Sequence, residues 1–381
     1  MQFTASHSKF TGHSPLRITI VCTVPTTKSG IPAVIFNLLS EMDRTGLQIH
    51  YVSINPIEPY FRQMLEGMGV TYSVIPRQIT HPFRYIRKLA KAAEGSHILH
   101  AHGNSATMVL EMIAAKQAGV PLRIAHGHST SCNMKLIDKV FRKSFYTLCN
   151  GHLACSEASG HWLFGTLPFK IINNAVDTAR FRFNAEMRAE MRRRLGVGDA
   201  PLFGHVGNFL PVKNHSFIID VFAAIAKDTP EARLILVGEG ELMKDIRHKV
   251  DAAGLSAKVI FTGSVPDPEN YLQAMDAVIM PSLYEGFPLS VVEQQANGLP
   301  VLASARITPQ LDMTGNVTFL PLESPAAQWA DTALRMVHSH HRDATTSTRA
   351  IESIRNHGFD LQQVAADLKT YYITESEKLR K

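Results

Sequence analysis

The amino-acid sequence predicts an α/β protein built from two doubly wound parallel sheets in succession. Short runs rich in β-branched residues alternate with amphipathic stretches of helical period, and this alternation is typical of parallel strands joined by crossover helices. The same pattern restarts after residue 200. A chain of 381 residues also exceeds what one hydrophobic core usually supports. We therefore expect two Rossmann-like domains.

Each domain is expected to contain several buried strands separated by helices. In the first half the strands are LRITIVCTV (16–24), IHYVSI (49–54), TYSVIP (71–76), HILHAH (97–102) and LRIAHGH (122–128), with helices at 31–42, 57–68, 82–94 and 105–118. In the second half the strands are at 202–207, 233–240, 258–263, 277–282 and 299–304, with helices at 214–227 and 241–252. Open α/β sheets bind ligands at the carboxyl ends of their strands, so we expect a ligand cleft between the two domains.

Breaks in this pattern give the domain boundaries. Residues 1–15 lack an apolar run and are expected to be a disordered lead-in. The first domain then covers 16–185 and the second 200–355, with the charged, glycine-ended stretch 178–200 as the connection. The last helical stretch, 360–381, lies too far from any strand to continue the repeat. We expect it to pack back on the first domain.

Composition excludes several classes of protein. No segment reaches the roughly 18 consecutive apolar residues that a membrane span needs. The amino-terminal segment has neither the basic nor the apolar region of a secretory signal. The four cysteines form no C-x-x-C pair, which predicts buried thiols in a reduced, cytoplasmic protein.

Charge is distributed unevenly along the chain. Residues 1–195 contain 23 Lys and Arg against 11 Asp and Glu, a net charge of +12; the remainder contains 16 against 22, a net charge of −6, and the two sum to +6. Basic and apolar residues share helical spacing in 81–95 and 133–148, which favours an anionic membrane surface as partner. The alternative is that these helices bury their apolar faces in the core. We expect no nucleic-acid partner, because no base-reading architecture is evident.

The most informative segment is SLYEGFPLSVVEQQANGLPVLAS (282–304), which follows a predicted buried strand. Pro288 suits the first position of a helix, and the first N–H groups and the dipole of that helix form an anion site. A bound anion repels carboxylates, so Glu285 and Glu293 are expected to accept hydrogen bonds from neutral hydroxyls, such as those of a sugar. The alternative is a capped surface helix with two solvated carboxylates.

The pattern Glu285-Gly286-Phe287-Pro288 followed by Glu293 resembles the Glu-x7-Glu signature of retaining GT-B glycosyltransferases of family 4. Three further segments agree with that family: VGNFLPVKNH (206–215), RLILVGEGEL (233–242) and VIFTGSVPD (259–267). Another three are similar to bacterial exopolysaccharide and capsule glycosyltransferases: HAHGNS (100–105), RIAHGHST (123–130) and LACSEASGHWLFG (153–165). The resemblance covers about residues 16–375 and implies the two-domain GT-B fold.

The resemblance also assigns roles in binding a nucleotide-sugar donor. It implies that Glu285 contacts the hydroxyls of the donor sugar, that Glu293 holds the ribose hydroxyls, and that backbone N–H groups near Phe287 meet the diphosphate. The other donor-binding residues that it implies are Gly30, Asn208, Lys213, Gly238, Glu239, Val265, Gly286, Pro288 and Leu289. The stretch 262–267 favours a uridine nucleotide by resemblance alone.

One position departs from the family pattern. The family usually has an arginine where this chain has Asn208, so Lys213 is left as the cation expected on the donor phosphate. We hypothesise that Lys28 or the helix N-terminus compensates. The alternatives are that Lys213 is an ordinary exposed lysine and that Gly30 is an ordinary loop glycine, neither with a role in binding.

Four histidines end two neighbouring predicted strands. The resemblance implies that His102 lies beside the transferred sugar and acts in catalysis with Glu285 and Lys213, while His100, His126 and His128 are assigned to the acceptor. The alternative is that these imidazoles are satisfied core residues. A zinc site is not expected, because no acidic or thiol third ligand is evident nearby. With no D-x-D sequence in the chain either, we expect no metal and no cofactor besides the UDP-sugar co-substrate.

Together these features predict a glycosyltransferase at the inner face of the cytoplasmic membrane. It is expected to move a hexose or N-acetylhexosamine from a UDP-sugar to a glycan acceptor on a polyprenyl diphosphate, with retention of configuration. Two alternatives stay open: a UDP-sugar epimerase of the same fold, and a non-catalytic nucleotide-sugar-binding subunit, for which Asn208 is the best argument.

Overall fold

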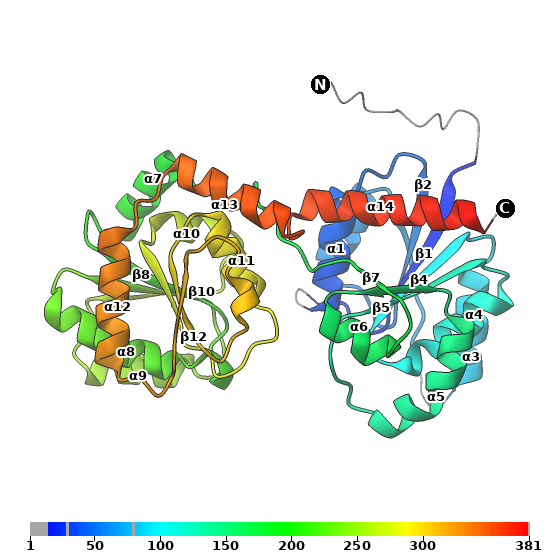
Figure 1. Ribbon diagram of the computed structural model, residues 1–381, viewed down its shortest axis with the longest axis horizontal. Helices are drawn as coiled ribbons and strands as arrows, with labels where there is room; N and C mark the ends of the chain where they lie inside the picture. The colour runs from blue at the N-terminus through cyan, green and yellow to red at the C-terminus, as the bar shows by residue number, and fades with distance from the viewer. Residues whose placement is uncertain (1–13, 28–29, 78–80, 380–381) are drawn as a thin grey trace. The chain divides into compact units, whose positions relative to one another are not determined.

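The computed structural model describes residues 14–27, 30–77 and 81–379 (Figure 1). Most of the expected disordered lead-in, residues 1–15, therefore lies outside the described residues. The chain divides into two compact units: residues 1–174 together with 361–381 form unit 1, and residues 175–360 form unit 2.

Within the described residues, unit 1 is built on a seven-stranded parallel sheet of order β3-β2-β1-β4-β5-β6-β7. The strands are β1 (Leu16–Cys22), β2 (Leu47–Ser53), β3 (Thr71–Val74), β4 (Ile98–Gly103), β5 (Leu122–Gly127), β6 (Gly151–Ala154) and β7 (Lys170–Ile171). The helices are α1 (Ile31–Glu41), α2 (Pro59–Gly67), α3 (Pro82–Ala92), η1 (Ala106–Met108), α4 (Val109–Gln117), α5 (Lys135–Leu148), α6 (Glu157–Phe164) and α14 (Leu361–Lys378).

The two faces of this sheet are covered by different helices. Leu99, Ala101 and Ala125 belong to a buried core that includes residues of α3, α4 and α5. Alternate positions of a strand point to the opposite face, and there His100 of β4 contacts Tyr372 of α14. The carboxyl-terminal helix α14 packs beside α1 on that face (Figure 1).

Unit 2 contains, within the described residues, a six-stranded parallel sheet of order β10-β9-β8-β11-β12-β13. The strands are β8 (Leu202–Val206), β9 (Arg233–Val237), β10 (Val259–Gly263), β11 (Ala277–Met280), β12 (Val301–Ser304) and β13 (Val317–Leu320). The helices are α7 (Ala185–Leu195), η2 (Pro211–Lys213), α8 (His215–Asp228), α9 (Met243–Ala252), α10 (Pro268–Ala274), α11 (Leu289–Ala296), η3 (Pro309–Leu311), α12 (Ala326–Ser339) and α13 (Ala344–Asn356).

The predicted fold class is confirmed, because both units are doubly wound parallel sheets covered by helices. The boundary differs from the expected one: unit 2 begins at Ala175, so residues 175–185 belong to unit 2 and not to the first domain. The reason is local contact. Thr178 donates a hydrogen bond to Asp360 (2.5 Å), and the backbone N–H of Val176 donates to the Phe359 carbonyl (3.0 Å).

Candidate active site

The strand order of unit 2 reverses between β8 and β11, and the loops that follow these two strands lie side by side. Ligands of doubly wound sheets bind at such a switch point, beyond the carboxyl ends of the strands. Backbone hydrogen bonds tie the loops at this edge together: Gly207 N–H to Val237 carbonyl (2.9 Å), Gly238 N–H to Gly263 carbonyl (3.0 Å) and Leu283 N–H to Val212 carbonyl (2.8 Å). The sheet therefore presents one connected set of loops at its carboxyl edge.

Lys213 and Glu285 meet across this switch point. Lys213 ends η2 after β8, Glu285 follows β11, and Lys213 Nζ lies 2.6 Å from Glu285 Oε1. Both side chains are largely shielded, with 17% and 15% of their surface exposed. The structure thus brings together two residues that the sequence assigned to catalysis, 72 positions apart, as an ion pair.

The helix after Glu285 begins one residue later than expected. Pro288 is the N-cap, with φ −72° and ψ 105°, and α11 starts at Leu289. Pro288 has no N–H group to offer, and within the described residues no side chain caps the helix. The first-turn N–H groups are those of Leu289 and Ser290, and the first turn contains no acidic residue, so the end of α11 retains its positive field.

Glu293 lies on α11 in a desolvated position. Its side chain is mostly buried, and no hydrogen bond joins it to another described residue. Desolvation raises the pKa of Glu293 to about 7, Arg180 opposes this rise and Glu269 adds to it. Arg180 itself is held by Glu269, with Nε and Oε1 2.8 Å apart. A buried carboxylate without donors is suited to accept hydrogen bonds from ligand hydroxyls.

The remaining predicted donor residues lie on the same loops. Asn208 and Glu239 are exposed, and the Glu239 carbonyl accepts a hydrogen bond from Phe209 N–H (2.9 Å). Val265 is partly buried against the core of unit 2, as is Phe287, whose ring stacks on that of Phe359 at 4.8 Å. The exposed Gly286 follows Glu285, and a Cβ there would meet nothing within 4 Å.

Gly238 is required by close packing and by its backbone. Its φ is +140°, and a Cβ at this position would lie 2.2 Å from the carbonyl oxygen of Gly207. Gly240, with φ +154°, would place a Cβ 2.8 Å from the backbone of Phe209. These glycines let the loop after β9 lie directly on the loop after β8.

Sequence reasoning missed two histidines beneath Lys213. His205 of β8 and His215 of α8 lie edge to face, with ring centroids 4.7 Å apart. Burial lowers the pKa of His215 to about 4 and that of His205 well below its usual range, and the Lys213 charge lowers both further. His205 Nε2 and both nitrogens of His215 have no hydrogen-bond partner within the described residues. No periodicity marks these positions, and only their places beside VGN and KN could have suggested them.

In unit 1 the predicted donor loop follows β1. Gly30 is the N-cap of α1, with φ +66°, and a Cβ there would meet nothing within 4 Å. The positive φ explains the glycine, and the open space beside it leaves room for a ligand. Lys28, the proposed compensating cation, lies outside the described residues.

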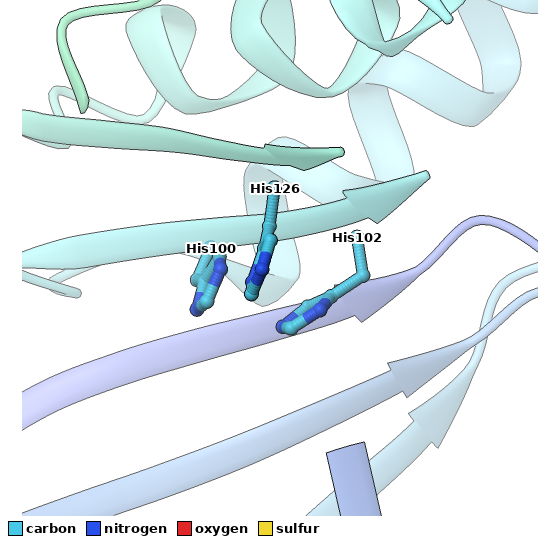
Figure 2. Close-up of side chains that lie close together, drawn as sticks. All are labelled: His100, His102 and His126. Carbon is cyan, nitrogen blue, oxygen red and sulfur yellow. The ribbon is translucent and has the colours of Figure 1, made fainter. Parts of the chain in front are cut away.

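The four predicted histidines of unit 1 form one cluster on a single face of β4 and β5. Figure 2 shows His100, His102 and His126 with their rings turned toward one another. The His100 and His102 rings are 4.0 Å apart, and the His102 and His126 rings 5.0 Å apart. His102 Nδ1 is 2.9 Å from Nε2 of His128, the first residue after β5.

Burial decides the charge state of this cluster. Desolvation lowers the pKa of His100, His102 and His126 well below 6.5 and that of His128 to about 4, and the neighbouring imidazoles lower most of them further. His100 and His126 expose none of their surface. They therefore offer no face to an acceptor in this conformation, and their assignment to acceptor binding stays a prediction.

The comparisons with known proteins agree with this geometry. Residues 187–336 match the family described as glycosyl transferases group 1. The chain is 29% identical to the putative glycosyltransferase EpsF of Bacillus subtilis over 92% of this chain and 95% of that protein. Over residues 187–336, which lie in unit 2, the chain is therefore similar to the group 1 glycosyltransferases. The resemblance seen in the sequence is thereby confirmed.

Two further proteins are similar to this chain. The chain is 29% identical to the Escherichia coli UDP-Gal:alpha-D-GlcNAc-diphosphoundecaprenol alpha-1,3-galactosyltransferase, over 54% of this chain and 57% of that enzyme. The crystal structure of Anabaena Alr3699/HepE in complex with UDP matches with a TM-score of 0.76 at 18% identity, covering 94% of this chain and 100% of that one. This match confirms the GT-B fold.

Proposed function

We propose that this glycosyltransferase moves a hexose or an N-acetylhexosamine from a UDP-sugar to a glycan acceptor on a polyprenyl diphosphate, with retention of configuration. The single observation that carries the donor half is the pairing of Lys213 with Glu285 at the switch point of unit 2, next to the uncapped start of α11. One cation, one set of free N–H groups and one shielded carboxylate are what a sugar diphosphate requires.

Each group at this point has a separate task. Lys213 Nζ turns to the diphosphate, and the N–H groups of Leu289 and Ser290 share that charge, so no metal on the diphosphate is needed. Glu285 accepts hydrogen bonds from hydroxyls of the donor sugar, and Glu293 accepts them from the ribose. UDP bound in the HepE structure and the UDP-Gal donor named for the Escherichia coli relative support a uridine nucleotide.

The chemistry is a displacement on one face of the sugar. The bond from the anomeric carbon to the phosphate oxygen breaks, the acceptor hydroxyl oxygen bonds to that carbon from the same face, and its proton passes to the leaving phosphate. Lys213 and the α11 N–H groups stabilise the charge that grows on the phosphate. A double displacement would need a carboxylate nucleophile on the opposite face of the sugar, and the family resemblance supplies no residue for that role.

The acceptor half rests on an apolar surface of unit 1. Four large side chains are exposed there: Phe83 on α3, and Leu136, Ile137 and Val140 on α5. Leu136, Ile137 and Val140 line a cavity of about 350 Å³ together with Pro82, Leu110, Met134 and Phe141. The surrounding exposed cations are Arg84, Arg87, Lys88, Lys135, Lys139 and Lys143. We call these exposed apolar and basic residues the basic apolar surface.

The two predicted membrane helices contribute unequally to this surface. In α3 (within 81–95) the apolar residues Tyr85, Ile86 and Leu89 are buried in the core, so the core-facing alternative holds for that helix except at Phe83. In α5 (within 133–148) Phe145 is core, but Leu136 and Val140 are 82% and 75% exposed. We propose that this surface lies on the anionic inner face of the cytoplasmic membrane, where a polyprenyl acceptor is anchored. Within the described residues no helix is long and apolar enough to cross a bilayer.

Measuring UDP release separates the candidate functions. The chain is incubated with UDP-glucose, UDP-galactose and their N-acetylated forms, with and without an undecaprenyl-diphosphate-linked sugar in vesicles. A glycosyltransferase releases UDP at an acceptor-dependent rate. Acceptor-independent release of UDP or free sugar would identify an epimerase-like enzyme, and binding without any release would identify a non-catalytic subunit. The coupling constant of the product's anomeric proton then tests retention, and an inverted product would contradict it.

A further inference from the structure

We propose that unit 1 contains a transition-metal site, with Zn²⁺ as the preferred ion, formed by His100, His102 and His126. The three side chains each offer one ring nitrogen, and these nitrogens lie within 4.8 Å of one another on one face of β4 and β5 (Figure 2). The sequence had argued against zinc because no acidic or thiol third ligand was evident. The fold supplies the third ligand as another histidine, from the neighbouring strand.

Register explains why the three rings meet. His100 and His102 are two residues apart on β4 and so point to the same face of the sheet. His102 pairs with His126 of β5 across the parallel ladder, which places the third imidazole beside them. Three imidazoles on two adjacent rigid strands form a ligand set that suits zinc and related ions.

Unpartnered nitrogens are the second observation. Both ring nitrogens of His126, and Nε2 of His100, are buried and make no hydrogen bond with the described residues, although a backbone group of Ile172 lies close enough to His126 to affect its pKa. A neutral imidazole always carries one donor and one acceptor. Burying the donor and the acceptor nitrogen of an imidazole without hydrogen-bond partners costs free energy, and a bound ion would offset that cost.

The outer hydrogen bonds fit the same reading. His100 Nδ1 is 2.7 Å from the hydroxyl of Tyr372, and His102 Nδ1 is 2.9 Å from His128. Each bond occupies Nδ1 and leaves Nε2 for an ion, which is how metal-binding histidines are usually oriented. Nitrogens up to 4.8 Å apart are wider than a tetrahedral zinc site, whose Zn–N bonds are roughly 2.0–2.1 Å, so small ring rotations accompany binding. A water or hydroxide would complete the coordination.

The three proposed ligands belong to unit 1, whereas the groups proposed above to hold the diphosphate belong to unit 2. A bound ion would cross-link β4 and β5 and, through Tyr372, fix α14. Failure of this inference would leave the UDP-sugar proposal untouched, since the test below uses no nucleotide.

The test is a Co²⁺ titration of the tag-free full chain after chelation, with ZnCl₂ as competitor. The background variant carries His338→Gln and His341→Gln, which removes two exposed histidines near the end of α12 that could bind metal at the surface. We expect one Co²⁺ per chain, the intense visible absorption of a tetrahedral site, and its displacement by an equimolar amount of Zn²⁺. His126→Phe, which fills the same apolar space without a ligand atom, is expected to weaken binding at least tenfold and to lose the band.

Two results would overturn the site. One is the absence of the visible band in the background variant, which would mean that water or nothing occupies the cluster. The other is an unchanged band in His126→Phe. As a second readout, ZnCl₂ is expected to raise the melting temperature of the background variant and not that of His126→Phe. If His126→Phe does not fold, His100→Asn is used in its place. The titration of the background variant alone already shows whether an ion binds.

Discussion

At the scale of single residues, Glu293 is the clearest case of a group whose present state is unfavourable without a ligand. Its carboxylate is desolvated, Arg180 is engaged by Glu269, and no described donor reaches it. A hydrophobic or amide side chain would be more stable at this position. The carboxylate is therefore best understood as a binding group held ready for hydroxyls.

The raised pKa of Glu293 predicts how donor binding depends on pH. If the ribose hydroxyls bind the carboxylate form, UDP-glucose affinity should fall about tenfold from pH 8 to pH 6, because protonation competes below pH 7. UDP-glucose is the right probe, since its diphosphate does not titrate in this range. Isothermal titration calorimetry at three pH values measures the effect. Glu293→Gln should bind weakly at every pH, and a wild-type affinity without pH dependence would contradict the assignment.

The same residue predicts a gain in stability on mutation. The folded pKa of about 7 lies above the unfolded value of 4.5, so the folded state holds the proton more tightly, and this stabilisation is lost as pH rises through 7. At pH 8 Glu293→Gln should therefore be more stable than the wild type by roughly 2 kcal/mol, with little difference at pH 4.5. Thermal unfolding at both pH values measures it. Glu231→Gln, on the surface, is the control and should change neither midpoint.

The proposed contact of Lys213 with the diphosphate predicts that its removal weakens the binding of UDP but not of uridine. Lys213→Met should weaken UDP binding by about 10- to 100-fold, the range expected for a charge-assisted hydrogen bond, and leave uridine binding unchanged. Equilibrium binding of both ligands measures this difference. Lys249→Met, which removes a surface pair with Asp220, is the matched control. An equal loss for UDP and uridine would show that Lys213 supports the fold and does not contact phosphate.

At the scale of elements, the close contact between the loops after β8 and β9 predicts a sharp glycine requirement. Gly238→Ala drives a Cβ against the carbonyl of Gly207, and neither backbone can retreat without breaking the bond from Gly207 N–H to Val237. Gly254 has a φ of +68°, in the left-handed helical region, and open space around it, so Gly254→Ala should cost only about 1 kcal/mol. Gly238→Ala is expected to lower both the free energy of unfolding and the affinity for UDP more than Gly254→Ala does. Equal losses in the two variants would contradict the packing argument.

Much of the fold could be predicted from the sequence, because its signals are local. Runs rich in β-branched residues predicted central strands of both sheets, such as β1 and β11, since buried parallel strands are continuously apolar. The edge strands β7 and β13, and β6 next to β7, have two to four residues and were not predicted. The sequence correctly predicted that α3 and α5 are amphipathic helices. Periodicity cannot distinguish an apolar face that packs on the core from one that contacts a membrane.

The candidate site could be predicted only in part, for a related reason. Glu285, Glu293 and the loop glycines carry motif signals within a few residues of one another. The pair formed by Lys213 and Glu285 depends on strand order, which no local pattern encodes. The histidine cluster depends on the pairing of β4 with β5, which places His126 beside His100 and His102, so a third imidazole could not be foreseen from the sequence, and the expectation of no metal stays a prediction.

At the scale of the whole molecule, the net charge of each structural unit says more about binding than the net charge of each half of the sequence. Unit 1 contains 21 Lys and Arg against 11 Asp and Glu, a net charge of +10, and unit 2 contains 18 against 22, a net charge of −4. Part of the basic first half belongs to α7 of unit 2, where Arg188 and Arg192 bind Asp276 and neighbouring carbonyls. Those arginines are structural, and the excess of basic residues lies in unit 1.

This division predicts how the protein binds vesicles. Binding should require anionic lipid and weaken strongly between 50 and 300 mM salt, roughly, because the exposed cations of unit 1 are screened over about a Debye length. Leu136→Ser with Val140→Ser should lower partitioning onto phosphatidylglycerol vesicles at least fivefold at any salt, since these two exposed side chains would insert. Leu379→Ser, also exposed on unit 1, is the control. Equal partitioning onto phosphatidylcholine vesicles, or no effect of the double variant, would contradict this proposal. In that case the surface formed by α3 and α5 would not bind the membrane, and α5 would be an ordinary surface helix.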